Sequence, residues 1–177
     1  MRDMLREQTR GVHDALDRSV GRIADEPAYR RYLRGLYVFR APIEEALRLA
    51  RIPKGLGDWQ VTPLAPRIGA DLDDLSEPRP EAGSWRGIPE PSVAAGMLYV
   101  LEGAAIGANI LRGRAARLGF GVSHGARHLA RPEEVGRWSV FVARLDRAPD
   151  VDPACALQGA RAAFDGATRA FAEVSMR

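Results

Sequence analysis

Apolar residues recur every three to four positions along most of the chain, the spacing that gathers side chains on one face of an α-helix. The clearest stretch is residues 3–20, where Leu5, Val12 and Leu16 mark the centre of one apolar stripe. No stretch shows the alternation of apolar and polar positions that is typical of a half-buried β-strand. The pattern therefore predicts an all-α protein.

Five further helices follow from the same spacing. They are expected at about residues 26–51, 63–74, 92–118, 132–145 and 153–174. Asp25, Ser92 and Asp152 stand where N-caps are needed, since a short polar side chain can accept a hydrogen bond from a free N–H of the first turn. Pro42 should kink the second helix because proline lacks a backbone N–H and clashes with the preceding turn. Loops are expected at residues 76–91 and 119–130.

The 177 residues, of which 46% are hydrophobic, suffice for a single folded domain over residues 1–177 and exclude intrinsic disorder. No run of about 18 apolar residues is expected to cross a membrane, and the N-terminus lacks the apolar core of a signal peptide. Cys155 is the only cysteine, so an internal disulfide is excluded and a cytoplasmic location is expected. Basic and acidic residues are interspersed, so nucleic acid is not an expected partner.

The chain has only three histidines: His13, His124 and His128. On a helical wheel, His13 lies at the edge of the first apolar stripe, in one row with Arg6, Arg10 and Asp17. An imidazole at the lip of an apolar pocket, with guanidiniums one or two turns away, suits a flat apolar ligand with anionic edges. The row itself equally allows a boundary histidine among surface ion pairs.

The predicted helix over residues 92–118 carries glycines in its interior. Gly96, Gly103 and Gly107 share one face, which Ala104 and Ala108 widen. Because an interior glycine costs about 1 kcal/mol relative to alanine, the row indicates a close approach to the backbone. Either another helix or a planar ligand could make that approach, and periodicity does not separate the two. Glycine at the second and third of these positions also allows the helix to bend.

Two motifs occur together in one known family. Residues 5–21, LREQTRGVHDALDRSVG, resemble the first helix of haem oxygenases, and residues 98–111, LYVLEGAAIGANIL, resemble the distal helix of their bacterial branch associated with bacteriophytochromes. The W-x-x-F-x-x-x-L pattern at residues 138–145 and Pro42 followed by Glu44–Glu45 are similar to weaker features of that group. The resemblance covers most of the chain and implies one haem-oxygenase-like helical domain with a kinked distal helix.

The resemblance implies a role for each residue of the first helix row. It makes His13 the proximal ligand of haem iron. It places Arg6 and Arg10 at basic positions that face haem propionates, and Asp17 at an acidic position near the proximal site.

The distal helix matches the family only in part. Gly103 and Gly107 fall at catalytic positions whose backbone lies over the haem. Ala104 and Ala108 fall at haem-contacting positions where relatives carry a polar residue and a second glycine. An aspartate at the first of these positions anchors water that delivers protons, and alanine does not.

The implied reaction is oxidative cleavage of haem to biliverdin with release of iron and carbon monoxide, haem being both cofactor and substrate. Electrons must come from an external donor, a ferredoxin or a reductase, since no flavin or nicotinamide motif is present. A bacteriophytochrome is the implied acceptor of the product. Two alternatives stay open: a relative that binds haem or another tetrapyrrole without degrading it, and a cofactor-free regulatory or interaction domain.

Other chemistry has less support in the residues. The Glu-x-x-His motif of helical di-iron proteins is absent. Cys155 has no histidine nearby in sequence and is expected to be inert. His124 and His128 gain no role from the resemblance and are interpreted as surface or loop residues.

Overall fold

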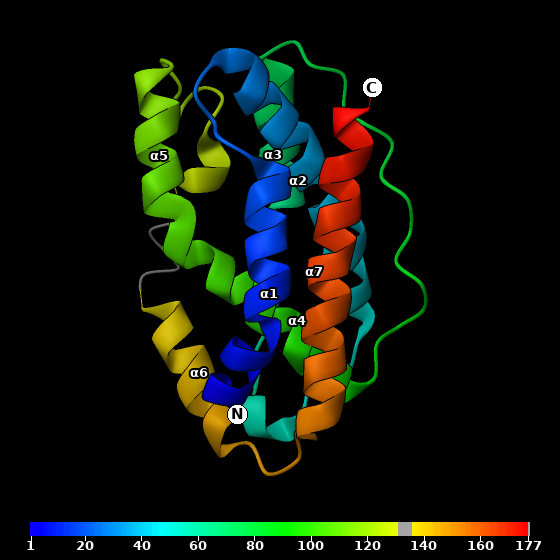
Figure 1. The fold of residues 1–177 in the computed structure, drawn as a ribbon. Helices are drawn as coiled ribbons and strands as arrows, with labels where there is room; N and C mark the ends of the chain where they lie inside the picture. The colour runs from blue at the N-terminus through cyan, green and yellow to red at the C-terminus, as the bar shows by residue number, and fades with distance from the viewer. Residues whose placement is uncertain (131–135, 177) are drawn as a thin grey trace.

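The computed structural model describes residues 1–130 and 136–176. Within these residues the regular structure is helical, and β-structure is limited to isolated bridges at Gly121. The elements are α1 (Arg2–Val20), α2 (Glu26–Leu49), η1 (Lys54–Leu56), α3 (Ala65–Asp74), α4 (Pro91–Gly103), η2 (Ala104–Gly107), α5 (Ala108–Arg117), η3 (Arg127–Leu129), α6 (Arg137–Arg147) and α7 (Pro153–Ser175), where η marks a short 3-10 helix (Figure 1). The all-α prediction is confirmed.

Two of the three expected N-caps are confirmed. The side chain of Asp25 accepts a hydrogen bond from the Ala28 N–H at 2.9 Å, and that of Asp152 accepts one from the Cys155 N–H at 2.8 Å. Pro42 lies inside α2, which continues past it to Leu49. Proline therefore removes one backbone donor from this helix without ending it.

The expected N-cap at Ser92 is wrong. Helix α4 begins one residue earlier, at Pro91, with Glu90 at the cap position. The Ser92 hydroxyl instead accepts a hydrogen bond from the backbone N–H of Asp152 at 3.0 Å. A long-range contact thus takes the oxygen that the local pattern assigned to a cap, and it ties the start of α4 to the start of α7.

The single helix predicted over residues 92–118 is divided. Helix α4 ends at Gly103, the 3-10 segment η2 follows at once, and α5 continues from Ala108. The bend expected at the glycines is therefore a change of hydrogen-bonding pattern. The start expected for the next helix, Pro132, lies outside the described residues, and α6 is described from Arg137.

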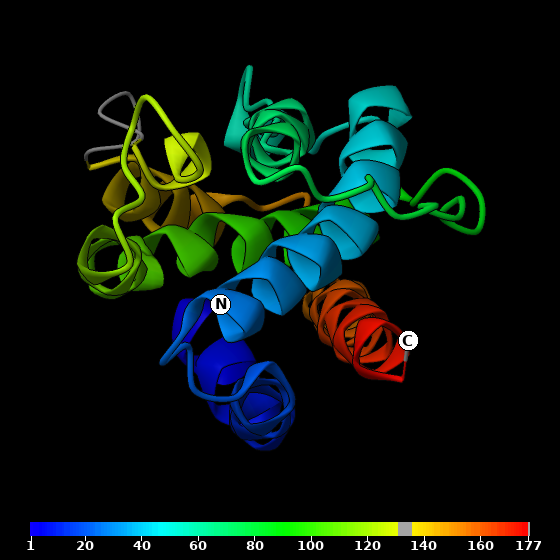
Figure 2. The same ribbon diagram turned by 90° about the horizontal axis from the view of Figure 1, so that it is seen from above.

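The core is built where α4 crosses α7. A Cβ atom added to Gly96 would lie 1.8 Å from the carbonyl oxygen of Ala156, and one added to Gly159 would lie 2.0 Å from that of Val93. The two backbones are therefore in direct contact. Seen from above, α1 and α7 lie on one side of α4, and α3 lies on the other (Figure 2).

Residues Pro91–Arg117 are long and apolar enough to cross a membrane by length and composition alone, because an 18-residue segment within them has a mean hydropathy of 1.5. The expectation that the chain has no such run does not hold by this measure. Half of that 18-residue segment is buried inside the structure. The buried central helix of a helical bundle meets the same criterion. Helix α4 is such a helix, since its backbone packs directly against that of α7.

Candidate functional site

His13 of α1 lies at the surface and contacts two neighbouring side chains, Asp17 and Phe164. The His13 side chain is 58% exposed, and its Nδ1 lies 3.3 Å from Oδ2 of Asp17, one turn further along α1. The His13 ring also meets the ring of Phe164 of α7 edge-on, with the centroids 5.7 Å apart. The Asp17 contact uses Nδ1 and leaves Nε2 as the nitrogen available to a ligand.

The two arginines of the row are exposed on the same helix. Neither Arg6 nor Arg10 forms an ion pair with a carboxylate among the residues described, and Asp17 is paired with His13. Burial is the main cause that raises the pKa of Tyr99 of α4, and the positive charges of Arg2 and Arg6 oppose this rise. Two guanidiniums without carboxylate partners are therefore available to an anion at this edge of α1.

The second half of the site is the 3-10 segment and the start of α5. The N–H of Ala108 donates to the carbonyl of Ala105, three residues earlier, as in a 3-10 helix. Ile106 and Ile110 are 62% and 65% exposed although they are apolar. A Cβ atom added to Gly107 would have no neighbour within 4 Å. This segment thus offers an open, apolar surface with accessible backbone, and α5 rises from it on one side of α1, with α7 on the other (Figure 1).

The three glycines of the row differ in what surrounds them. Gly96 is used for helix packing, as described above. A Cβ atom added to Gly103 would lie 3.4 Å from the ring of Trp138 of α6, in ordinary van der Waals contact. Only Gly107 of the three faces open space.

The two alanines of this segment differ in their surroundings. Ala104 is exposed. Ala108 is half-buried and packs against the core cluster that includes Ala115 of α5 and Leu129 of η3. The methyl group of Ala108 therefore points at least partly toward the core.

The side chains that could bind a metal do not cluster. Among the described residues, no three His, Cys, Asp or Glu side chains come together where they could hold a metal ion. His13 can contribute one ligand only. A metal bound at this position needs further ligands that the described residues do not supply.

The other two histidines lie around residues 119–130, away from α1. His124 is exposed, as expected. The expectation that His128 is a surface or loop residue is wrong: its side chain is 2% exposed, and its Nδ1 lies 2.7 Å from Oδ2 of Asp71 of α3, which is fully buried. The local sequence around His128 reads as a loop because its partner is 57 positions away.

Cys155 is half-buried near the start of α7. A hydrogen bond with Asp152 is the main cause of a raised pKa of its thiol, and burial adds to it. The reactive thiolate form is therefore disfavoured, which agrees with the expectation of an inert cysteine.

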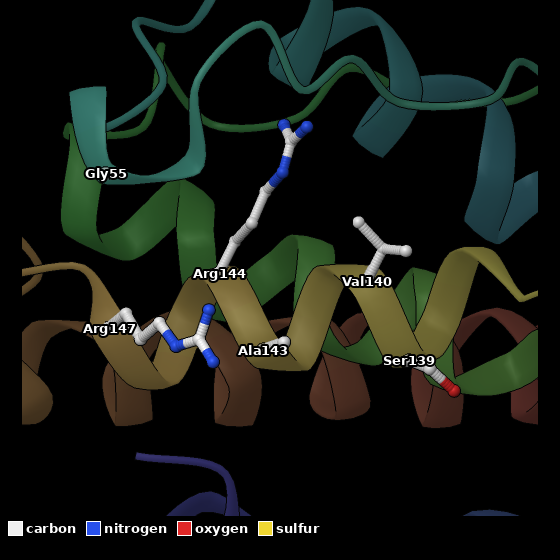
Figure 3. Close-up of a pocket in the computed structure, with 6 residues that line it drawn as sticks. All are labelled: Gly55, Ser139, Val140, Ala143, Arg144 and Arg147. Atoms are coloured by element: carbon white, nitrogen blue, oxygen red, sulfur yellow. The ribbon is translucent and has the colours of Figure 1, made fainter.

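A shallow groove of about 430 Å³ lies elsewhere, between η1 and α6. It is lined by Gly55, Ser139, Val140, Ala143, Arg144 and Arg147, none of which is a predicted site residue (Figure 3). Arg144 extends from α6 toward η1 and donates a hydrogen bond to the carbonyl of Leu56 at 2.9 Å (Figure 3). The side chain of Arg144 therefore connects α6 to η1.

Sequence reasoning did not assign three aromatic residues to the site. Phe164 lies against His13, Trp138 covers Gly103, and Tyr99 packs against Trp138. Each fits the apolar periodicity of its own helix, so no local signal separates it from an ordinary core residue. The pattern W-x-x-F-x-x-x-L at residues 138–145 was the one available indication for Trp138.

Comparison with known proteins places this arrangement in a family. No protein-family model matches the chain. The chain is 36% identical over 141 residues to heme oxygenase PigA of Pseudomonas aeruginosa, covering 75% of this chain and 69% of that protein. The NO- and CO-bound heme oxygenase of Neisseria meningitidis has a similar crystal structure, with a TM-score of 0.80 and 29% identity, covering 96% of this chain and 89% of that one. On the strength of the sequence relationship and the shared fold, the chain belongs to the haem oxygenase family.

Proposed function

We propose that the protein is a haem oxygenase, which cleaves haem to biliverdin with release of iron and carbon monoxide. The observation that carries the proposal is the accessible imidazole of His13, held through Nδ1 by Asp17 on the fold of this family. The described residues offer no cluster of metal ligands around it. A porphyrin brings four nitrogen ligands of its own, so a single protein imidazole suffices for haem.

In this proposal the residues of α1 bind and orient the substrate. His13 ligates the iron through Nε2, and Asp17 fixes the orientation of the ring and increases the basicity of the imidazole, as carboxylates beside metal-bound histidines do. Arg6 and Arg10 form charge-assisted hydrogen bonds with the haem propionates. Their lack of carboxylate partners among the described residues supports this role.

Residues of the α4–η2–α5 run form the opposite wall. Gly107 presents backbone to open space, Gly103 lacks a side chain between its backbone and the ring of Trp138, and Ile106 and Ile110 exclude water from the apolar face of the haem ring. Haem supplies the iron that reacts with dioxygen and is itself the molecule that is opened. Ala104 carries no polar group to hold a proton-delivering water, so we assign that task to backbone carbonyls and ordered water.

The proposal extends to the partners and the location. The whole chain acts as one helical domain in the cytoplasm, and an external ferredoxin or reductase supplies the electrons. A bacteriophytochrome as acceptor of biliverdin is supported by the resemblance of residues 98–111 alone.

The test is a haem titration followed by turnover. The purified protein should develop a Soret band that saturates at one haem per chain. Addition of a reductant and dioxygen should then replace that band with biliverdin absorption and release carbon monoxide. A Soret band that persists would show a haem-binding protein without oxygenase activity, and failure to develop the band would favour a cofactor-free helical domain.

A further inference from the structure

A buried carboxylate lies at the point where α4 gives way to the 3-10 segment. Glu102, the residue before Gly103, is 5% exposed. Its Oε1 accepts a hydrogen bond from the indole Nε1–H of Trp59 at 2.9 Å. Its two oxygens also accept hydrogen bonds from Nε and Nη2 of Arg137, each at 2.9 Å, in the two-pronged geometry that guanidinium and carboxylate favour.

The same arginine holds a third segment in place. Its guanidinium lies over the ring of Trp59, 4.2 Å from the centroid, and its Nη2 also donates to the carbonyl of Gln60. The cluster of Glu102, Arg137 and Trp59 therefore joins the end of α4, the start of α6 and the chain that follows η1.

This cluster also determines what covers the first glycine of the proposed site. Trp138 follows Arg137 directly, and its ring lies against Gly103 and against Tyr99, with the two ring centroids 5.3 Å apart. The start of α6 thus pairs with residue 102 and covers residue 103. The hydrogen-bonding pattern of the helix changes at the next residue, Ala104.

Stability alone is a weak reason for such a cluster. Removing charged groups from water is costly, and a buried ion pair often adds little to the free energy of unfolding compared with apolar residues of the same shape. Its directional hydrogen bonds can instead fix one arrangement among several. A mid-helix 3-10 stretch is a place where such fixing matters, because these segments frequently act as hinges.

We propose that the cluster of Glu102, Arg137 and Trp59 is a positioning device that fixes where α4 ends and so sets the placement of residues 103–107 over the substrate. The inference rests on the proposed function for the identity of the substrate. That the cluster fixes the end of α4 applies to the ligand-free protein as well. Glu102 acts through Arg137 and Trp138 and does not touch the substrate.

The first experiment uses the ligand-free protein. In Glu102→Gln, the indole N–H signal of Trp59 should move upfield in the proton NMR spectrum, because its acceptor loses its charge. The amide signals of Gly103 and Gly107 should broaden or double, since the segment samples more than one arrangement. Arg137→Lys, which keeps the charge but loses the two parallel N–H donors, should affect the same signals. This variant tests the proposal if Glu102→Gln folds poorly.

The matched control is Glu45→Gln. Glu45 accepts two hydrogen bonds from Arg48 at 2.8 and 2.7 Å on the exposed face of α2. This substitution also removes the charge of a carboxylate paired with an arginine, but at a position outside α4 and its contacts with α6. The signals of Gly103 and Gly107 should stay single and sharp in this variant.

The second experiment uses the haem-loaded protein reduced under carbon monoxide. The C–O stretching band reports the surroundings of the ligand, and it should broaden or split in Glu102→Gln while the haem affinity stays within about threefold of wild type, because α1 is intact. The proportions of biliverdin isomers should shift as well. Unchanged amide signals, C–O band and isomer proportions in both variants, with only the melting temperature lowered, would overturn the proposal. Failure of wild type to bind haem would refute the proposed function, and the NMR comparison would still decide whether the cluster fixes the end of α4.

Discussion

Single side chains with the same local chemistry differ here in what surrounds them. His13 and His124 are 58% and 57% exposed, and the nearest carboxylate oxygen lies 3.3 and 3.7 Å from Nδ1, respectively. Only His13 shares a helix face with two arginines that lack carboxylate partners among the described residues. The two histidines are therefore a natural pair for testing whether position, rather than an exposed imidazole, makes the site.

His13→Ala should lower the affinity for haem at least about tenfold, because the proposed protein ligand to the iron is lost. His124→Ala should leave the affinity within about twofold of wild type. Haem titrations followed by the Soret band measure both. Equal losses in the two variants would show that haem binds wherever an exposed imidazole is available.

The elements α4 and η2 differ in whether a glycine can be replaced by a residue with a side chain. At Gly96 the nearest atom to an added Cβ is a backbone oxygen at 1.8 Å, so neither helix can yield without moving as a whole. At Gly107 an added Cβ meets nothing within 4 Å. The φ of Gly107 is −76°, which any residue adopts.

Gly96→Ala should lower the free energy of unfolding by about 3 kcal/mol or more, since overpacking at a backbone contact forces α4 and α7 apart. Gly107→Ala should raise the free energy of unfolding by up to about 1 kcal/mol, because alanine has a higher helix propensity than glycine. Urea unfolding of the two variants in the absence of haem measures the difference. A small loss for Gly96→Ala would show that the crossing can widen without cost.

Residues 125–128, which follow α5, are anchored on α3 by two aspartates. Asp71 accepts hydrogen bonds from the backbone N–H groups of Arg127 and His128, and Asp74 accepts one from that of Gly125 at 2.7 Å. A hydrogen bond from the Arg127 guanidinium is the main cause that lowers the pKa of Asp74 below its usual 3.8. Since α5 packs against η3, this anchor also supports the helix that carries the second half of the candidate site.

The lowered pKa of Asp74 predicts acid sensitivity. A carboxyl group whose pKa is lower in the folded state stabilises the fold above its unfolded pKa, and this contribution is lost as pH falls through the folded value. Wild type should therefore lose more stability between pH 5 and 3 than Asp74→Asn does, as measured by urea unfolding at each pH. Asp14→Asn, at an exposed position of α1, is the control and should follow wild type.

At the scale of the whole molecule, an open site links substrate binding to stability. A ligand that binds only the folded state stabilises it by about 2.7 kcal/mol at a hundredfold excess over Kd. For a protein of this size, that corresponds to a rise in melting temperature of about 5–10 °C. Haem should produce this rise in wild type and a smaller one in His13→Ala. A Soret band without any rise would indicate haem adsorbed at sites outside the folded pocket.

The helices of this fold could be predicted from sequence because their signals are local. Apolar spacing marks the helices, and Asp25 and Asp152 cap the helices that the pattern places after them. The bend at Gly103 and Gly107 was also expected from their residue type. Helical spacing also places His13 in one row with Arg6, Arg10 and Asp17, and the motif resemblance implies the role of each.

The rest depends on partners distant in the chain. Ser92 bonds to residue 152 instead of capping its own helix, and His128 is buried because Asp71 of α3 is there to pair with it. The Glu102–Arg137 pair spans 35 positions, so neither residue carries a local sign of it. Sequence patterns report the periodicity of an element and not the neighbour that its polar side chains meet.

The division of one helical run between Gly96 and Gly107 has a consequence for how the protein can vary. Substitutions near the α4–α7 crossing act on folding, whereas those at the exposed residues Ala104, Ile106, Asn109 and Ile110 change the surface and leave the core as it is. A library of variants at these positions should therefore yield soluble protein at most sites of the second group, even where function is altered. Ala104, one of the two departures from the family pattern, is among these permissive positions, where a lineage can alter its chemistry without first losing its fold, whereas Ala108 packs against the core.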